Sequence, residues 1–370
     1  MGEGQGQIGS VRIPSALRTR RFTENDLPRM SDFMNLFRDG DVTSARQPHD
    51  VEFWRWKFLN NPVGAGEVWL TEDGDMLIGT TSITPKKMKI REMIVPAAEI
   101  GDTFTHPDYQ KRGIFTTLVG LSREHALSRG ISFIYGTPNN QSLPPYERRC
   151  SFAQTPSVEV ANMVRPVNMR SVLRTVTKSR VLATVASPFL TMAYALLFRL
   201  NRKQSKSGIS ITQVDSFPDE VEALWAGNSQ SYDVIQVRDK AYLEWRYVTN
   251  PGDYTILVAR RAEVVVGYMV AKTRFARSLR LGCVADFLIL RDDVDVFREL
   301  LIETFERLRR DGVDLVYCWT NDTRFQRVLR RTGFLRYMRQ PVICYQNELG
   351  KDVVGNQYRW YFTVGDSDNI

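Results

Sequence analysis

One stretch of sequence decides the fold: Phe104-Thr105-His106-Pro107-Asp108-Tyr109-Gln110-Lys111-Arg112-Gly113-Ile114-Phe115. Residues 97–105 contain few breakers and predict a strand, which His106-Pro107 ends. Beyond Gly113, apolar residues recur with helical spacing, and Gly130 closes the segment as a helix C-cap would. The order of strand, turn and helix is typical of an α/β unit.

The turn between strand and helix carries the features of an anion site. Backbone N–H groups at the start of a helix are positively polarised and suit a phosphate group. Lys111 and Arg112 add two full positive charges beside them, and Gly113 lets the backbone approach closely. These residues therefore predict a pyrophosphate-binding turn.

The turn resembles the acyl-CoA loop of the GCN5-related N-acetyltransferases (GNAT), which reads Gln/Arg-x-x-Gly-x-Gly/Ala. Gln110 and Gly113 follow this pattern, and Phe115 departs from it because the family usually has a small residue there. The resemblance implies an α/β fold, acetyl-CoA as the acyl donor and no metal. It also implies cofactor contacts from the backbone of Phe104 and Thr105 and from the loop residues Gln110, Lys111, Arg112, Gly113, Ile114 and Phe115.

The next segment follows the family's order of parts. Residues 131–135 form a short apolar run that predicts a strand, and Tyr146 lies in a short helical segment that leads to Phe152. By resemblance, Asn139 or Asn140 contacts the CoA arm and Tyr146 protonates the departing thiolate. The family's Tyr stands four residues before a Gly, whereas Tyr146 stands five before Ser151, so a partly buried structural tyrosine is the alternative.

An amine that attacks a thioester must lose a proton, so a base is expected near the acetyl group. Glu99 and Asp102 lie on the strand that leads to the loop, and strict alternation would place them on opposite faces. We prefer Asp102 because it lies nearer the acetyl position; a structural role for it is the alternative. His106 and His125 are further candidates, although a loop start and a helix interior are more typical of structural histidines.

An internal repeat divides the chain into two copies of one unit. Trp56-Lys57-Phe58-Leu59-Asn60-Asn61-Pro62 recurs as Trp245-Arg246-Tyr247-Val248-Thr249-Asn250-Pro251, and the run 130–135 recurs at 312–317. We therefore predict two GNAT-like domains in tandem on mixed sheets. The predicted ranges are a flexible tail at 1–16, domains at 17–168 and 209–347, a helical apolar and basic connector at 169–208, and a tail strand at 348–370.

The second copy lacks the chemistry of the first. Asp292, Asp293 and Asp295 stand where a pyrophosphate would have to bind, and their charges would repel it. Leu329 occupies the position of the acid tyrosine and has no proton to donate. The sequence therefore predicts a degenerate C-terminal copy that keeps the fold, walls the substrate cleft and leaves the acyl-CoA site to the N-terminal copy.

Residues 181–198 contain no charged side chain and are flanked by basic residues on both sides. Three interpretations stay open for this segment: a helical connector buried between the domains, a helix on an anionic membrane surface, and a membrane span. The polar start of the chain does not resemble a secretory signal, which favours a cytoplasmic protein, with a peripheral position at the inner face of the membrane as a variant.

Other functional classes find little support. Cys150, Cys283, Cys318 and Cys344 have no metal-ligand or disulfide spacing, and no Walker, dinucleotide or serine-hydrolase motif occurs. The net charge of +8 fits an anionic partner such as CoA. Basic and acidic residues are interspersed, so nucleic acid is an unlikely partner.

The C-terminal run 359–368 and the Trp-Lys/Arg signatures resemble tandem acetyltransferase-like proteins of bacterial polysaccharide assembly. This resemblance implies N-acetyl transfer to a small-molecule amine such as an amino sugar, and Thr363, Asp366 and Asp368 could reach the cleft. Two alternatives are a non-catalytic acetyl-CoA-binding or scaffold protein and a long-chain N-acyltransferase at the membrane surface. The sequence predicts neither the acceptor's identity nor the oligomeric state.

Overall fold

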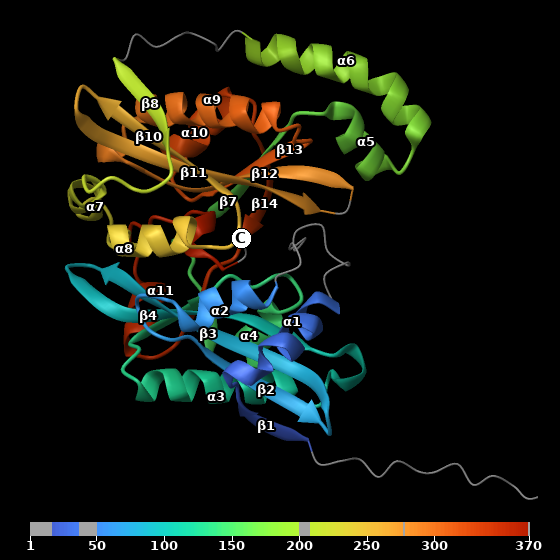
Figure 1. The fold of residues 1–370 in the computed structure, drawn as a ribbon, viewed down its shortest axis with the longest axis vertical. Helices are drawn as coiled ribbons and strands as arrows, with labels where there is room; N and C mark the ends of the chain where they lie inside the picture. The colour runs from blue at the N-terminus through green and yellow to red at the C-terminus, as the bar shows by residue number, and fades with distance from the viewer. Residues whose placement is uncertain (1–16, 37–49, 200–207, 277, 369–370) are drawn as a thin grey trace, which may run out of the picture.

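The chain folds into two α/β domains, each built on one mixed sheet (Figure 1). The computed structural model describes residues 17–36, 50–199, 208–276 and 278–368. The tail predicted at 1–16 lies outside the described residues. The predicted mixed α/β class is confirmed.

Strands from both halves of the chain build each sheet. In pairing order, the first contains β1 (Arg18–Arg21), β2 (Glu67–Asp73), β3 (Met76–Ile90), β4 (Met93–Thr105), β5 (Phe133–Gly136), β15 (Ile343–Tyr345) and β6 (Phe152–Gln154), with β9 (Val234–Gln236) paired to β3. The second contains β14 (Leu335–Gln340), β7 (Val160–Pro166), β13 (Leu315–Thr320), β12 (Leu279–Ile289), β11 (Val264–Ala276), β10 (Tyr254–Arg261) and β8 (Ile209–Val214).

Helices cover the sheets and join them. The first half contributes α1 (Leu27–Leu36), α2 (Val51–Leu59), α3 (Ile114–Ser128) and α4 (Leu143–Arg149), and the connector contributes α5 (Met169–Thr177) and α6 (Arg180–Arg199). The second half contributes α7 (Val221–Ser229), α8 (Lys240–Leu243), α9 (Val294–Arg310), α10 (Thr323–Arg331) and α11 (Glu348–Gly355). α9 and α10 pack on one face of the second sheet, and the first domain lies on the other side of that sheet (Figure 1).

The two copies exchange a strand. β15 inserts between β5 and β6, where Cys344 pairs with both Tyr135 and Ala153. β7 inserts between β13 and β14, where Val164 pairs with both Tyr317 and Leu335. Each sheet is therefore completed by the other copy, and the predicted ranges 17–168 and 209–347 describe sequence copies rather than separate sheets.

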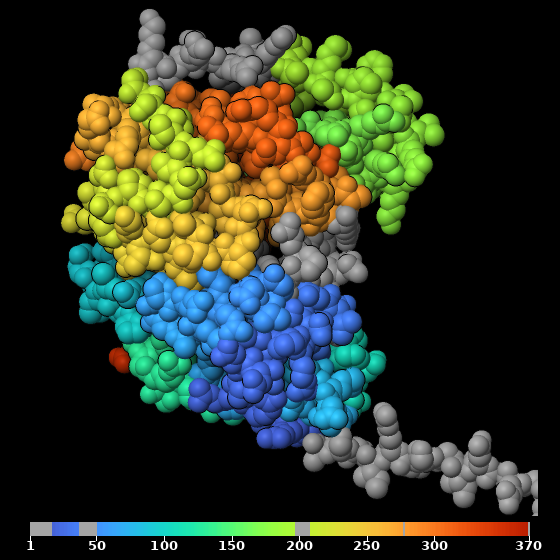
Figure 2. All heavy atoms as spheres, in the orientation of Figure 1, coloured from blue at the N-terminus to red at the C-terminus, as the bar shows by residue number. Residues whose placement is uncertain are grey.

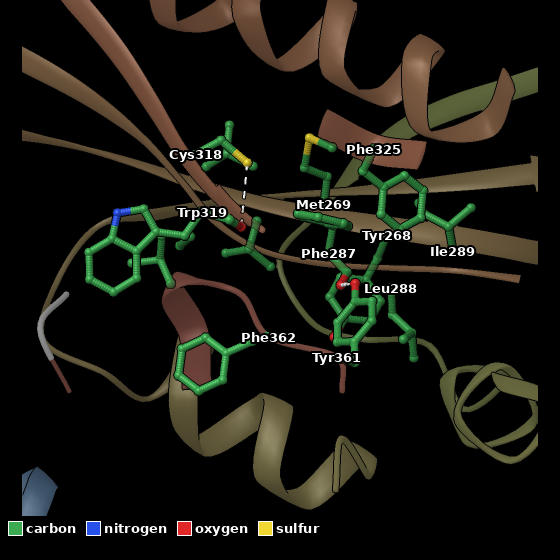
Figure 3. Packing of buried hydrophobic residues seen from close by; sticks show 14 of the residues in the cluster. Tyr268, Met269, Phe287, Leu288, Ile289, Cys318, Trp319, Phe325, Tyr361 and Phe362 are labelled. Carbon is green, nitrogen blue, oxygen red and sulfur yellow. Dashed lines mark hydrogen bonds between the residues drawn. The ribbon is translucent and has the colours of Figure 1, made fainter. Parts of the chain in front are cut away.

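The side chains of β13 show how the second sheet separates two environments. Cys318 points toward the helix-covered core with Phe325 and Met269, whereas Trp319 projects to the opposite side of the strand (Figure 3). Successive strand residues point to opposite faces, so Trp319 lies on the face of this sheet that looks toward the space between the domains.

The connector is helical, as predicted, but it is not buried between the domains. α5 and α6 pack on each other at the outer edge of the second domain, and α6 lies far from the first sheet (Figures 1 and 2). Apolar side chains of α6 are exposed to solvent, among them Val181, Val185, Phe189 and Met192. No helix in the described ranges has the length and apolar character needed to cross a membrane.

The repeated Trp signatures meet at the contact between the copies. The rings of Trp56 and Trp245 stack at a centroid distance of 4.7 Å and an interplanar angle of 18°. Trp56 Nε1 donates to the carbonyl of Trp245 at 2.8 Å, and Trp245 Nε1 donates to the carbonyl of Trp56 at 3.3 Å. The repeat found in the sequence is therefore a reciprocal contact in the structure.

We predict that this contact holds the two domains together. Trp56→Ala should lower the free energy of unfolding by about 3–5 kcal/mol, because it removes a buried ring and leaves a cavity. Trp56→Phe keeps a ring and loses one hydrogen bond, at a cost of about 1 kcal/mol. Urea denaturation followed by tryptophan fluorescence and circular dichroism measures both. Equal costs for the two variants would show that the stacked ring contributes nothing.

Candidate active site

A cavity of about 440 Å³ lies between the two domains. One wall comes from β4, from the β5–α4 loop and from α4 of the first domain. The facing wall is the face of the second sheet opposite α9 and α10, with side chains from β7, β11, β12, β13 and β14, and α5 contributes Val172 and Val176. The cavity thus exists only because the two domains are held together.

The first sheet opens at the cavity. β4 and β5 run parallel and pair only from Ala97 to Glu99 on β4. Beyond Glu99, β4 continues to Thr105, and no described strand pairs with this side of it. The free strand edge leaves backbone donors and acceptors available, and an extended ligand can add to such an edge as a further strand would.

The loop predicted to hold a pyrophosphate lies at the end of this opening. Gly113 takes a φ of 82° as the N-cap of α3, and the backbone of Lys111 is also left-handed, with a φ of 65°. Gln110, Lys111, Arg112 and Gly113 are exposed, and Arg112 lies over the ring of Tyr109 at 4.9 Å. The exposed helix start therefore combines free donors with two cations.

Phe115 does not obstruct this loop. Its ring packs edge-on against Tyr146, with centroids 5.0 Å apart. The aromatic residue that departs from the family pattern is thus turned toward the protein interior, where it helps to fix the orientation of Tyr146. Ile114 is buried beneath the helix start and also points away from the loop surface.

Tyr146 lies at the wall of the cavity. Its hydroxyl is 2.8 Å from the Thr103 hydroxyl, and its ring also packs against Phe152. Burial raises the pKa of Tyr146 above its ordinary value, and the hydrogen bond from Thr103 offsets only part of this shift. A neutral phenol that can donate a proton therefore faces the cavity.

Glu99 and Asp102 lie on the same side of β4, contrary to the expected alternation. Asp102 has a φ of 46° and belongs to a β-bulge, since the pairing of β3 with β4 shifts between Thr80 and Ser82. A bulge adds a residue to one strand and re-aims its side chains. The prediction of opposite faces was wrong because it assumed a regular strand.

Both carboxylates belong to a buried charge network at the base of the cavity. Asp102 Oδ2 lies 2.5 Å from Lys57 Nζ and accepts from the Ser82 hydroxyl at 2.7 Å. Asp368 joins Lys57 at 3.1 Å and Lys86 at 3.0 Å. Because Lys57 and Lys86 are fully buried, the carboxylates around them are needed to keep these charges in the interior.

Glu99 is the carboxyl group of this network whose pKa is raised. Its side chain accepts from Thr137 at 3.2 Å and from the backbone N–H of Asp368 at 2.9 Å, and Lys86 Nζ is 3.8 Å away. Burial, reinforced by the negative charge of Asp368, raises the pKa of Glu99 to about 8. A carboxylate with this pKa is a suitable proton acceptor near neutral pH.

The predicted asparagines and histidines are not part of this charge network. Asn139 lies at the cavity, but its side chain accepts from the backbone of Gln141 and Ser142 and so shapes the loop before α4, while Asn140 is exposed beside it. His106 accepts from the backbone of Asp108, and His125, on α3, contacts Glu67 of β2. Neither histidine lines the cavity.

Of the tail residues considered, the structure brings only Asp368 to the cavity. Thr363 and Asp366 instead bind Arg238, with Asp366 Oδ2 at 2.8 Å from its guanidinium. The sequence analysis did not predict that Lys57 and Lys86 belong to the charge network. Lys57 did carry a signal, since it belongs to the repeated Trp signature, as does Arg246, which lies 3.5 Å from Asp368.

The corresponding loop of the second copy is closed to an anion. Asp293 caps α9 by accepting from the backbone of Asp295 and Val296, so a carboxylate already occupies the helix start. Asp292 accepts from Arg324 at 2.8 Å and from Arg359 at 3.1 Å. In the described ranges, no group of three or more His, Cys, Asp and Glu side chains could hold a metal ion.

We predict that acyl-CoA binds at the first loop and not at the second. The double variant Arg112→Glu, Gly113→Asp should abolish acetyl-CoA binding in a calorimetric titration, because two negative charges replace the features that attract a pyrophosphate. Arg291→Glu, at the corresponding loop of the second copy, is the matched control and should bind as the wild type does. Loss of binding in the control alone would show that acetyl-CoA binds at the second copy, which would contradict the prediction.

Comparison with known proteins agrees with this architecture. Residues 18–153 match the family model described as acetyltransferase (GNAT) domain. No curated protein sequence matches the chain. Among solved structures, N-myristoyltransferase of Saccharomyces cerevisiae with bound myristoyl-CoA is similar, with a TM-score of 0.64 and 14% identity over 96% of this chain and 86% of that one.

Two further solved structures share the fold. A tandem GNAT protein from the clavulanic acid biosynthesis pathway has a TM-score of 0.59 and 14% identity, over 89% of this chain and 98% of that one. A probable N-acyltransferase of Enterococcus faecalis V583 has a TM-score of 0.58 and 13% identity, over 89% of this chain and 72% of that one. Residues 18–153 thus match a GNAT acetyltransferase domain, and the chain as a whole has the fold of a tandem GNAT protein.

Proposed function

We propose that the protein is an acyl-CoA-dependent N-acyltransferase that transfers an acetyl group to a primary amine by direct attack on the thioester. One observation carries this proposal: the opening between β4 and β5 leads from an exposed, basic helix start into a cavity that presents a perturbed carboxylate and a neutral phenol. The donor would lie along β4 between Phe104 and the loop.

Each chemical step has a residue suited to it. The amine nitrogen attacks the thioester carbonyl carbon, and a C–N bond forms as the C–S bond breaks. Glu99 takes the proton that the nitrogen loses, and the Tyr146 hydroxyl gives a proton to the departing thiolate, so the products are an amide and CoA with a free thiol. Asp102, held by Lys57, fixes the shape of the bulge and is a positioning residue in this scheme.

The cavity also bears on the acceptor. Its second-domain wall contains Val164, Leu281 and Leu315, and α5 adds Val172 and Val176. These apolar side chains suit an amine with an apolar body. An amino sugar of polysaccharide assembly is the alternative acceptor, because polar side chains such as Asn162 and Gln340 also line the cavity.

A second candidate is transfer of a long acyl chain at a membrane surface. The exposed apolar residues of α6, including Phe189 and Leu196, would contact lipid, and basic residues of α5 and its flank would face anionic headgroups. The similarity to a structure of N-myristoyltransferase with bound myristoyl-CoA is consistent with a long-chain donor. In this case the cavity would hold the acyl chain.

A thiol-release assay with acetyl-, octanoyl- and palmitoyl-CoA and a panel of primary amines tests both candidates. We expect acceptor-dependent turnover with acetyl-CoA and a kcat about 10²–10⁴-fold lower in Tyr146→Phe, because that variant lacks the acid. Preference for palmitoyl-CoA would favour the second candidate. Acyl-CoA binding without turnover for any pair would contradict both and indicate a scaffold protein.

The pKa of Glu99 predicts a pH dependence. The carboxylate form accepts the proton, so kcat/KM should fall about tenfold for each pH unit below about 8. The amine's own protonation adds to this slope, so the measurement is the ratio of wild-type to Glu99→Gln rates with the same acceptor. This ratio should rise with pH and then level off. A ratio that stays constant across pH would show that another group is the base.

A further inference from the structure

Arg274 is a buried cation that no carboxylate in the described part of the chain neutralises. Its side chain is only 6% exposed, it lies on β11, and it lines the cavity. Its guanidinium carbon is 5.0 Å from the centre of the Tyr317 ring. No hydrogen bond or ion pair joins Arg274 to any residue in the described part of the chain.

The other buried arginines and the lysines of the charge network behave differently. Lys57 and Lys86 contact Asp102 and Asp368, and the buried Arg238 and Arg246 lie within 3.5 Å of Asp366 and Asp368 respectively. Placing a charge in the interior is costly unless a partner of opposite sign is present. A carboxylate partner for Arg274 would therefore have to lie in the cavity beside it.

Further polar atoms in the same wall also lack partners. Asn162 Oδ1 and Trp319 Nε1 are buried without a hydrogen-bond partner among the described residues, and both side chains line the cavity. Trp319 pairs with Asn162 across β13 and β7, so the two lie side by side on the face that also carries Arg274. Buried polar groups at a cavity wall take hydrogen bonds from whatever fills the cavity, whether ordered water or a polar ligand.

The position of Arg274 separates it from the reacting groups. Arg274 pairs with Leu281, and Leu281 pairs with Leu315 on β13. Trp319 lies four residues further along β13, or roughly 13 Å at 3.3 Å per residue. Gln340, whose side chain donates to the carbonyl of Pro138 at 3.1 Å, marks the end of the cavity that touches the first domain.

We propose that Arg274 binds a carboxylate on the acceptor, so that the substrate is an amine with an apolar body and an anionic group. This inference rests on the proposed function and specifies its acceptor class. The guanidinium fork matches a carboxylate with two parallel hydrogen bonds, and the Tyr317 ring holds its plane. Val164, Leu281 and Leu315 surround the apolar part of the ligand.

The same residue argues against a plain acyl chain as the occupant of this wall. An alkyl chain next to Arg274 would leave the guanidinium without water and without a partner, which is the costly state described above. A carboxylate removes this cost. The pyrophosphate of CoA has its own site at Gly113, so the anion recognised by Arg274 belongs to another part of the substrates.

Calorimetry on protein loaded with CoA tests the proposal without requiring turnover. The probes are phenylalanine and ε-aminocaproate, each compared with the amine that lacks its carboxylate, phenylethylamine and pentylamine. We expect at least one carboxylate probe to bind tenfold or more tightly than its partner. Arg274→Gln should remove this difference, and Arg274→Lys should restore part of it. Arg280→Gln, on β12 and outside the cavity lining, is the matched control and should bind as the wild type does.

The outcomes separate this inference from the proposed function. Loss of the carboxylate preference in Arg274→Gln with unchanged CoA binding supports the inference. Equal binding of the paired probes to wild type, or equal weakening of both in Arg274→Gln, overturns it while leaving acyl transfer intact. If Arg274→Gln instead slows thiol release from succinyl-CoA and not from acetyl-CoA, the recognised carboxylate belongs to the acyl group, and the assignment to the acceptor is wrong.

Discussion

The exchange of β7 and β15 between the two sheets is the constraint on which the rest of the structure depends. Each sheet needs a strand of the other copy to satisfy its backbone hydrogen bonds, so the two sequence copies cannot separate without breaking both sheets. A permanent interface can bury charges that a transient one would leave in water. Lys57, Lys86 and Arg246 meet carboxylates at this interface, and the cavity lies directly above them.

Duplication has allowed the two copies to take different tasks. In the first copy the start of α3 is exposed and carries basic residues, whereas in the second copy Asp293 occupies the start of α9. The second copy still contributes to the site, because the face of its sheet opposite α9 and α10 forms the cavity wall. Arg274 and Trp319 show that this wall has polar groups of its own, and not only an apolar surface.

Several features could be predicted from sequence because their causes are local. The turn at Gly113, the strand before it and the repeat of the Trp signature are read from neighbouring residues. The bulge at Asp102 could not be predicted, since it depends on the register of β3 against β4. The exchanged strands and the burial of Lys57 beside Asp368 join residues from opposite ends of the chain, and no local pattern encodes such contacts. The apolar 181–198 segment forms a helix, but its exposed position depends on packing that only the structure shows.

A crystal structure of the protein with acetyl-CoA tests the central claim most directly. The account predicts one bound molecule per chain, with the pyrophosphate at the N-terminus of α3, the pantetheine arm along the free edge of β4, and the thioester carbon in the cavity between Glu99 and Tyr146. A molecule bound at the start of α9, or one whose thioester lies outside the cavity, would contradict it.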